Sequence, residues 1–167
     1  MDRKRAVNSG DSLEHFTRQY GDLIFDLCIS LLNSSQKAQN AFRTILRRIH
    51  SKRKKERFSV YERSWVLRIT CETLLSLREE REGSSQEKIR QEKIRMDTEE
   101  SPTSKLEEFQ LYFRRLEPED QILLLLRDTF GIPYSEVSVA MALPEGSLKI
   151  RRQQALRTLE DWLWNRK

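Results

Sequence analysis

Apolar residues recur every three or four positions through most of the chain, which is the period of one face of an α-helix. The first half contains three such stripes, and each predicts a helix. Gly and Pro are sparse, and no stretch of alternating β-branched residues predicts a strand. The stripes consist of Leu13, Phe16, Tyr20, Leu23, Ile24, Leu27, Cys28 and Leu31; of Ala38, Ala41, Phe42, Ile45, Leu46 and Ile49; and of Trp65, Val66, Ile69, Thr70, Thr73, Leu74 and Leu77.

These stripes divide the chain into two folded parts. The three helices can bury one another's apolar faces, which predicts a first domain over residues 11–81. Residues 82–104 contain a tandem QEKIR repeat and no aromatic side chain, so they are predicted to form a polar linker. Residues 105–167 regain the helical pattern, with the all-apolar run Ile122–Leu126 at their centre. The sequence therefore predicts an all-α protein of two small helical domains joined by a polar linker.

The end of the chain has the parts of a helix-turn-helix. Gly131 and Pro133 end the apolar helix, residues 134–142 predict a short helix, and residues 143–146 predict a turn before a final helix from about Ser147. A short support helix, a tight turn and a second helix that can enter the major groove are what this motif needs. An amphipathic helix with a solvated basic face is the alternative. The candidate duplex-DNA contacts are Ser147, Lys149, Arg151, Arg152 and Gln153.

The net charge of +5 is unevenly placed, and its positive excess is concentrated in one segment. Residues 43–57 hold eight Lys or Arg against Glu56. A focused basic surface suits nucleic-acid phosphates, although a solvated surface is the alternative. Positive charge next to aromatic rings suits single-stranded DNA, because the phosphates meet the charge and the bases stack on the rings. The alternative is that the rings of Phe58 and Tyr61 pack against Trp65. The candidate single-strand contacts are Lys52, Arg53, Lys54, Lys55, Phe58 and Tyr61.

The second half resembles the second domain of bacterial sigma factors of the compact, two-domain extracytoplasmic-function (ECF) type. That family has a Leu-Pro start, a Leu-rich helix, Tyr-x-Glu-Ile-Ala, and then Pro-x-Gly-Thr-Val-Lys before a basic helix. The corresponding residues here are Leu116, Pro118, Tyr134, Glu136, Val137, Pro144, Gly146, Ser147, Leu148, Lys149, Arg151, Ala155 and Leu159.

The first domain resembles the same family at fewer positions. Ala38 fits the family's Ala-Glu-Asp-x-x-Gln-Glu stretch, which docks on RNA polymerase. The family's −10 helix has Trp-Leu-x-Arg-Ile-Ala-x-Asn, and Trp65, Val66, Arg68 and Ile69 fit it. The departures are Gln39 and Asn40 for the acidic pair, Arg43 and Thr44 for Gln-Glu, and Glu72 for the −10 Asn. Lost carboxylates and a gained Arg43 should weaken docking on a basic partner.

The resemblance implies an ECF-like sigma factor that directs RNA polymerase to promoters and initiates transcription. The first domain would bind the polymerase core through Gln39, Asn40 and Arg43 and capture the −10 strand, and the second would read the −35 duplex. The implied partners are the polymerase core and promoter DNA, with an anti-sigma factor as a further candidate. A sigma-derived regulator that binds DNA or protein without starting transcription is the alternative.

An enzyme is the third class and has little support. The sequence contains no Gly-rich phosphate loop, no nucleophile–base motif and no metal-spaced cluster, so we expect no catalytic residue, cofactor or metal. Cys28 and Cys71 are expected to be buried thiols in a reducing compartment. No run approaches the roughly 20 apolar residues of a membrane span and no signal peptide is apparent, so a cytoplasmic protein without membrane insertion is expected.

Overall fold

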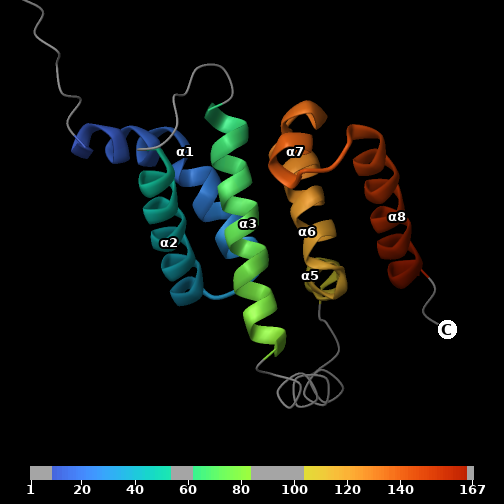
Figure 1. Cartoon of the computed structure of the whole chain (residues 1–167). Coiled ribbons are helices and arrows are strands. Elements are labelled where there is room, and N and C mark those ends of the chain that lie inside the picture. The colour runs from blue at the N-terminus through green and yellow to red at the C-terminus, as the bar shows by residue number, and fades with distance from the viewer. Residues whose placement is uncertain (1–8, 54–61, 84–103, 165–167) are drawn as a thin grey trace, which may run out of the picture.

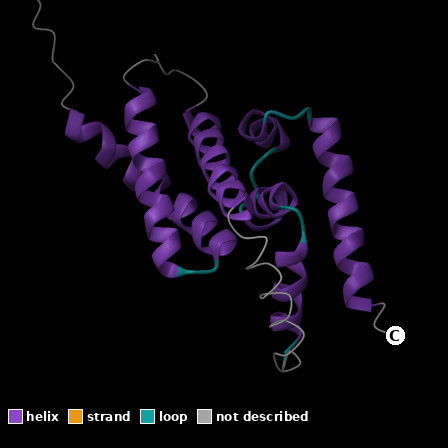
Figure 2. Ribbon diagram, turned by 60° about the horizontal axis from the view of Figure 1, so that its bottom comes forward, coloured by secondary structure: helices purple, strands orange, loops and turns teal. Residues whose placement is uncertain are grey.

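The computed structural model describes residues 9–53, 62–83 and 104–164. Every regular element in these ranges is a helix (Figure 2), which confirms the predicted all-α class. The expected linker overlaps the end of one helix, and its residues 84–103 lie outside the described ranges.

The first unit is a bundle of three helices, α1 (Ser9–Leu32), α2 (Ser35–Arg53) and α3 (Glu62–Gly83). Asn33 separates α1 from α2 with a positive φ of 47°, a conformation that Asn tolerates better than most residues. The predicted stripe of α1 from Phe16 onward and that of α2 point inward, and Phe16, Ile24, Ile45 and Ile49 are among the fully buried side chains.

The second unit follows the predicted order of helix and turn. It contains α5 (Lys105–Arg115), α6 (Pro118–Leu124) continuing as the π-helical turn η1 (Leu125–Thr129), α7 (Tyr134–Met141) and α8 (Glu145–Trp164). Pro118 occupies the first turn of α6, as expected. Gly131 ends the buried helix with a φ of 65°, which a residue with a side chain adopts at a cost.

Helix α3 is covered on two sides, which its apolar stripe did not predict. Leu67 and Cys71 lie outside that stripe, yet both are buried. Figure 1 shows α3 between α1 and α2 on one side and the second unit on the other, where it packs on α7 and α6. One apolar cluster therefore runs through both units, and a smaller cluster joins α5 to α8.

Candidate nucleic-acid interface

Helices α7 and α8 form the predicted helix-turn-helix. Helix α7 ends at Met141, and the left-handed φ of 54° at the following Ala142 turns the chain sharply. The Ser138 hydroxyl donates to the Leu143 carbonyl oxygen at 2.6 Å and closes this turn. Helix α8 begins at Glu145, two residues before the expected start at Ser147, and buries Leu148 and Ala155. The motif thus holds α8 by one apolar face and leaves its opposite face outside.

The outer face of α8 carries three of the five predicted duplex contacts. Ser147, Lys149 and Gln153 are exposed. The Lys149 ammonium also lies 5.5 Å from the centroid of the Tyr134 ring, a cation–π contact that orients it. Ile150 was not among the candidates, yet 60% of it is exposed on the same helix. An exposed apolar side chain among polar ones can contact a thymine methyl group in the major groove.

The other two candidates, Arg151 and Arg152, are held by carboxylates of their own unit. The Arg151 guanidinium bonds Asp120 in α6. The Nε of Arg152 donates to both carboxylate oxygens of Asp128 in η1, at 3.0 and 2.9 Å, and these bonds raise the pKa of Arg152 above its ordinary value. Both arginines are about one-third exposed, so they anchor α8 on the buried helix while remaining partly accessible.

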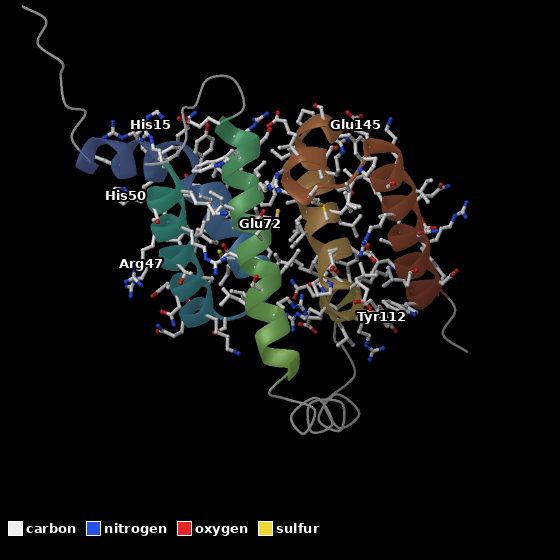
Figure 3. All side chains as sticks on the ribbon, viewed as in Figure 1. His15, Arg47, His50, Glu72, Tyr112 and Glu145 are labelled. Atoms are coloured by element: carbon white, nitrogen blue, oxygen red, sulfur yellow. The ribbon has the colours of Figure 1, made fainter. Side chains whose placement is uncertain are left out.

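The basic surface of the first unit lies on α2. This helix carries six Lys or Arg and no acidic residue. Arg43 and Arg47 are exposed, and Figure 3 shows Arg47 pointing away from the bundle. Lys52 is partly engaged, since its Nζ lies 3.3 Å from the Glu72 carboxylate. The Arg53 guanidinium stacks 4.8 Å from the centroid of the Phe16 ring. The other predicted single-strand contacts, Lys54, Lys55, Phe58 and Tyr61, lie outside the described residues.

Glu72 stands where the ECF pattern has the Asn near the −10 element, and here it organises the basic surface. Its carboxylate accepts hydrogen bonds from Arg68 at 3.0 Å and from Lys52 at 3.3 Å. Burial opposes its ionisation, but these two hydrogen bonds outweigh burial and hold its pKa below the usual value. Glu in place of the family's neutral Asn therefore adds a charge at this position, and this charge holds Lys52 of α2 and Arg68 of α3 beside each other.

The predicted polymerase contacts form one patch on α2. Gln39, Asn40 and Arg43 are all exposed. A cavity of about 160 Å³ lies beside them, lined by Lys37, Asn40, Thr44 and Leu77 among others. The patch is polar and positively charged, and it borders a shallow hollow that a partner's side chain can enter.

The described residues hold no group of three His, Cys, Asp or Glu that could bind a metal ion. Cys28 and Cys71 are free and buried, as predicted, and burial raises the pKa of each thiol to about 12. Within the described part of the chain, no helix is both long and apolar enough to cross a membrane.

Comparison with known proteins shows what the second unit and the overall fold are similar to. Residues 106–159 match the family model described as sigma-70, region 4. A co-crystal structure of the sigma factor RpoE with the anti-sigma factor NepR from Bartonella quintana is similar, with a TM-score of 0.62 at 15% sequence identity. The match covers 93% of this chain and 99% of that one. No curated protein matches the sequence.

Proposed function

We propose that this chain is a sigma factor that directs RNA polymerase to promoters and initiates transcription, because its residues 106–159 match the sigma-70 region 4 model and its fold is similar to that of the sigma factor RpoE. The observation that carries the proposal is the exposed outer face of α8 on a region 4 helix-turn-helix. Sigma factors bind and position rather than catalyse. Since polymerase and DNA are cytoplasmic in bacteria, the chain would act there.

In this proposal each unit contacts a different form of DNA. Helix α8 reads the −35 element in the major groove, with Ser147, Lys149 and Gln153 on its outer face. The basic segment that begins at Lys52 holds the separated −10 strand, because positive charge follows phosphates and aromatic rings stack on unpaired bases. The patch of Gln39, Asn40 and Arg43 contacts the polymerase core. An anti-sigma factor is a further proposed partner, since the similar RpoE was crystallised with one.

The sigma-derived regulator is the second candidate, and Arg43 favours it. No described ion pair neutralises Arg43, so the docking patch presents a bare positive charge. A basic docking surface on the partner would be repelled by it. A sigma factor with this patch therefore needs a neutral or acidic docking surface on its polymerase.

The role of the two anchored arginines can be tested with matched variants. We expect Arg152→Ala to weaken specific duplex binding by about 1–3 kcal/mol, because a paired contact to a base is lost. Asp128→Ala removes the partner but keeps the guanidinium, so it should preserve binding. The pair Arg151→Ala and Asp120→Ala should behave alike. Fluorescence anisotropy on a −35 duplex and a scrambled duplex measures both effects.

Lys149→Ala serves as the comparison, because Lys149 is expected to contact a phosphate. This variant should weaken binding to both duplexes equally and reduce the salt slope by about 1. Equal losses for Arg152→Ala and Asp128→Ala would show that the arginine serves the fold and not the base contact. Chemical denaturation of each variant separates a loss of stability from a loss of base contact, since a partly exposed ion pair contributes at most about 1 kcal/mol.

Promoter opening tests the whole proposal. In reconstituted transcription with core polymerase and a promoter library, the wild-type chain should give specific start sites. A fluorescent base analogue in the −10 strand should report opening with wild type, and Phe58→Ala or Tyr61→Ala should reduce it, since each stacked base contributes roughly 1–3 kcal/mol. Closed-complex binding through α8 should be unchanged.

Normal opening in both aromatic variants would assign these rings to packing against Trp65. No opening and no start site with the wild-type chain would favour the regulator that binds without initiating.

A further inference from the structure

We infer that the chain has a binding site for a small aromatic carboxylic acid, in a cavity of about 320 Å³ among α1, α5, η1 and α8. Cavities of about 300–1,000 Å³ are the usual size of small-molecule sites in proteins. The site goes beyond the proposed function, since it depends only on the side chains that line the cavity and not on promoter DNA or polymerase.

The wall of the cavity on α5 is aromatic. Phe109 and Phe113 lie one turn apart, with their ring centroids 6.0 Å from each other and an angle of 24° between the ring planes. Ile29 of α1 and Leu156 of α8 add aliphatic surface from the other sides. A flat ring system packs well against such rings and loses less conformational freedom on binding than a flexible chain does. The apolar lining therefore favours a ligand with an aromatic body.

The charges at the cavity favour an anion. Among the described residues that line it, Arg114 and Asp128 are the charged ones. The Asp128 carboxylate is already engaged, because both of its oxygens accept hydrogen bonds from Arg152 Nε, at 3.0 and 2.9 Å. The Arg114 side chain is exposed and pairs with no other described residue. A carboxylate is ionised at neutral pH and can accept two N–H bonds from this free guanidinium.

The volume limits the size of the ligand. A cavity of roughly 150 Å³ holds one benzene molecule. The cavity of about 320 Å³ is therefore large enough for about two fused rings. Ser30, Asn33 and Thr129 line it as well, and their neutral polar groups can bond the second oxygen of a carboxylate or a ring substituent. An acid of about 13 non-hydrogen atoms fits this space.

The cavity adjoins α8 without covering its outer face. Leu156 and Leu159 of α8 line the cavity, beyond the predicted duplex contacts, which end at Gln153. Asp128 belongs both to the cavity and to the ion pair that anchors Arg152. A bound ligand therefore contacts residues that hold α8 in place and leaves free the face that would meet DNA.

Calorimetric titration of the full chain with β-naphthoate, an acid of this size, tests the site. In the absence of DNA and polymerase we expect one molecule to bind per chain, with a dissociation constant on the order of 100 µM. β-Naphthamide has the same shape and no charge. It should bind about fivefold more weakly, because it lacks the ion pair with the guanidinium.

The charge preference is assigned with two neighbouring arginines. Arg114→Gln should remove the preference for β-naphthoate over β-naphthamide, while Arg115→Gln should keep it. Arg115 is the matched control because it is also exposed on α5, but its guanidinium lies over the Tyr112 ring, 5.4 Å from the centroid, and it does not line the cavity.

The position of the site is tested by filling the cavity. Ser30→Phe places a ring in it from α1 and should abolish binding of both probes. Asp26→Phe is the matched control, since Asp26 is exposed one turn earlier on α1 and does not line the cavity, so this variant should bind both probes as wild type does. Circular dichroism checks that both variants keep their helices. If Ser30→Phe unfolds, Gln110→Phe fills the cavity from the exposed side of α5 and decides the question.

Each contrary result rejects a defined part of the inference. Binding of neither probe overturns the site and leaves the aromatic wall of α5 to a protein partner. Equal binding of the two probes, or equal effects of Arg114→Gln and Arg115→Gln, overturns the ligand class. Unchanged binding in a folded cavity-filling variant places the probe elsewhere and overturns the site. All of these measurements are made without a promoter, so a chain that binds β-naphthoate but starts no transcription rejects the proposed function alone.

Discussion

Replacing Gln121 with Leu is expected to lower the free energy of unfolding of this chain by about 2–4 kcal/mol, because it strips three hydrogen bonds from a buried site. Only 1% of Gln121 is exposed. Its amide nitrogen donates to the carbonyl oxygens of Leu116 at 2.7 Å and Arg114 at 3.2 Å, and its oxygen accepts from Arg78. The two carbonyls belong to the end of α5, where the helix itself provides no partner. Leu has a similar volume, so the loss isolates the polar contacts.

Two further variants make the result interpretable. Gln121→Glu keeps an acceptor for Arg78 but loses the amide donor, so it separates the α5 contacts from the contact with α3. Gln153→Leu changes an exposed glutamine on α8 and should alter stability by less than about 0.5 kcal/mol. Urea denaturation followed by circular dichroism measures all three. A loss below about 0.5 kcal/mol for Gln121→Leu would mean that water satisfies these carbonyls.

The largest effect on DNA binding is expected from the basic segment. Replacing Lys52, Arg53, Lys54 and Lys55 by Ser should reduce the slope of log affinity against log salt by up to about 3 for single-stranded DNA, since each lost phosphate contact contributes about 0.7. Over a fourfold change in salt, such a slope corresponds to roughly fiftyfold in affinity. Titration of a labelled −10 strand at several salt concentrations measures it.

The four residues of the basic segment should contribute unequally to the change in salt slope. Lys52 already contacts Glu72 and Arg53 stacks on Phe16, so replacing these two should reduce the slope less than replacing Lys54 and Lys55. Lys105→Ser with Arg114→Ser removes two exposed charges from α5, outside the segment, and should leave the slope unchanged. A slope that depends only on the number of charges removed, wherever they lie, would point to net charge and not to a local site.

Much of the architecture follows from the sequence because its causes are local. Apolar spacing along α1 and α2 placed their buried faces, and Pro118 and Gly131 marked where the buried helix of the second unit begins and ends. The turn residues before α8 predicted the helix-turn-helix. Each of these signals acts over a few residues, through backbone preference or the period of a helix.

Only the tertiary structure shows which side chains of different helices pair with or bury one another. The pairing of Arg151 with Asp120 and of Arg152 with Asp128 joins residues 31 and 24 positions apart, and turns two predicted DNA contacts into anchors as well. Leu67 lies outside the predicted apolar stripe, yet it is buried because a second unit covers α3. No local pattern contains this information, because burial depends on which surface arrives from elsewhere in the chain. Local sequence patterns therefore predict the helices, whereas packing between residues far apart in the chain determines which helices contact one another.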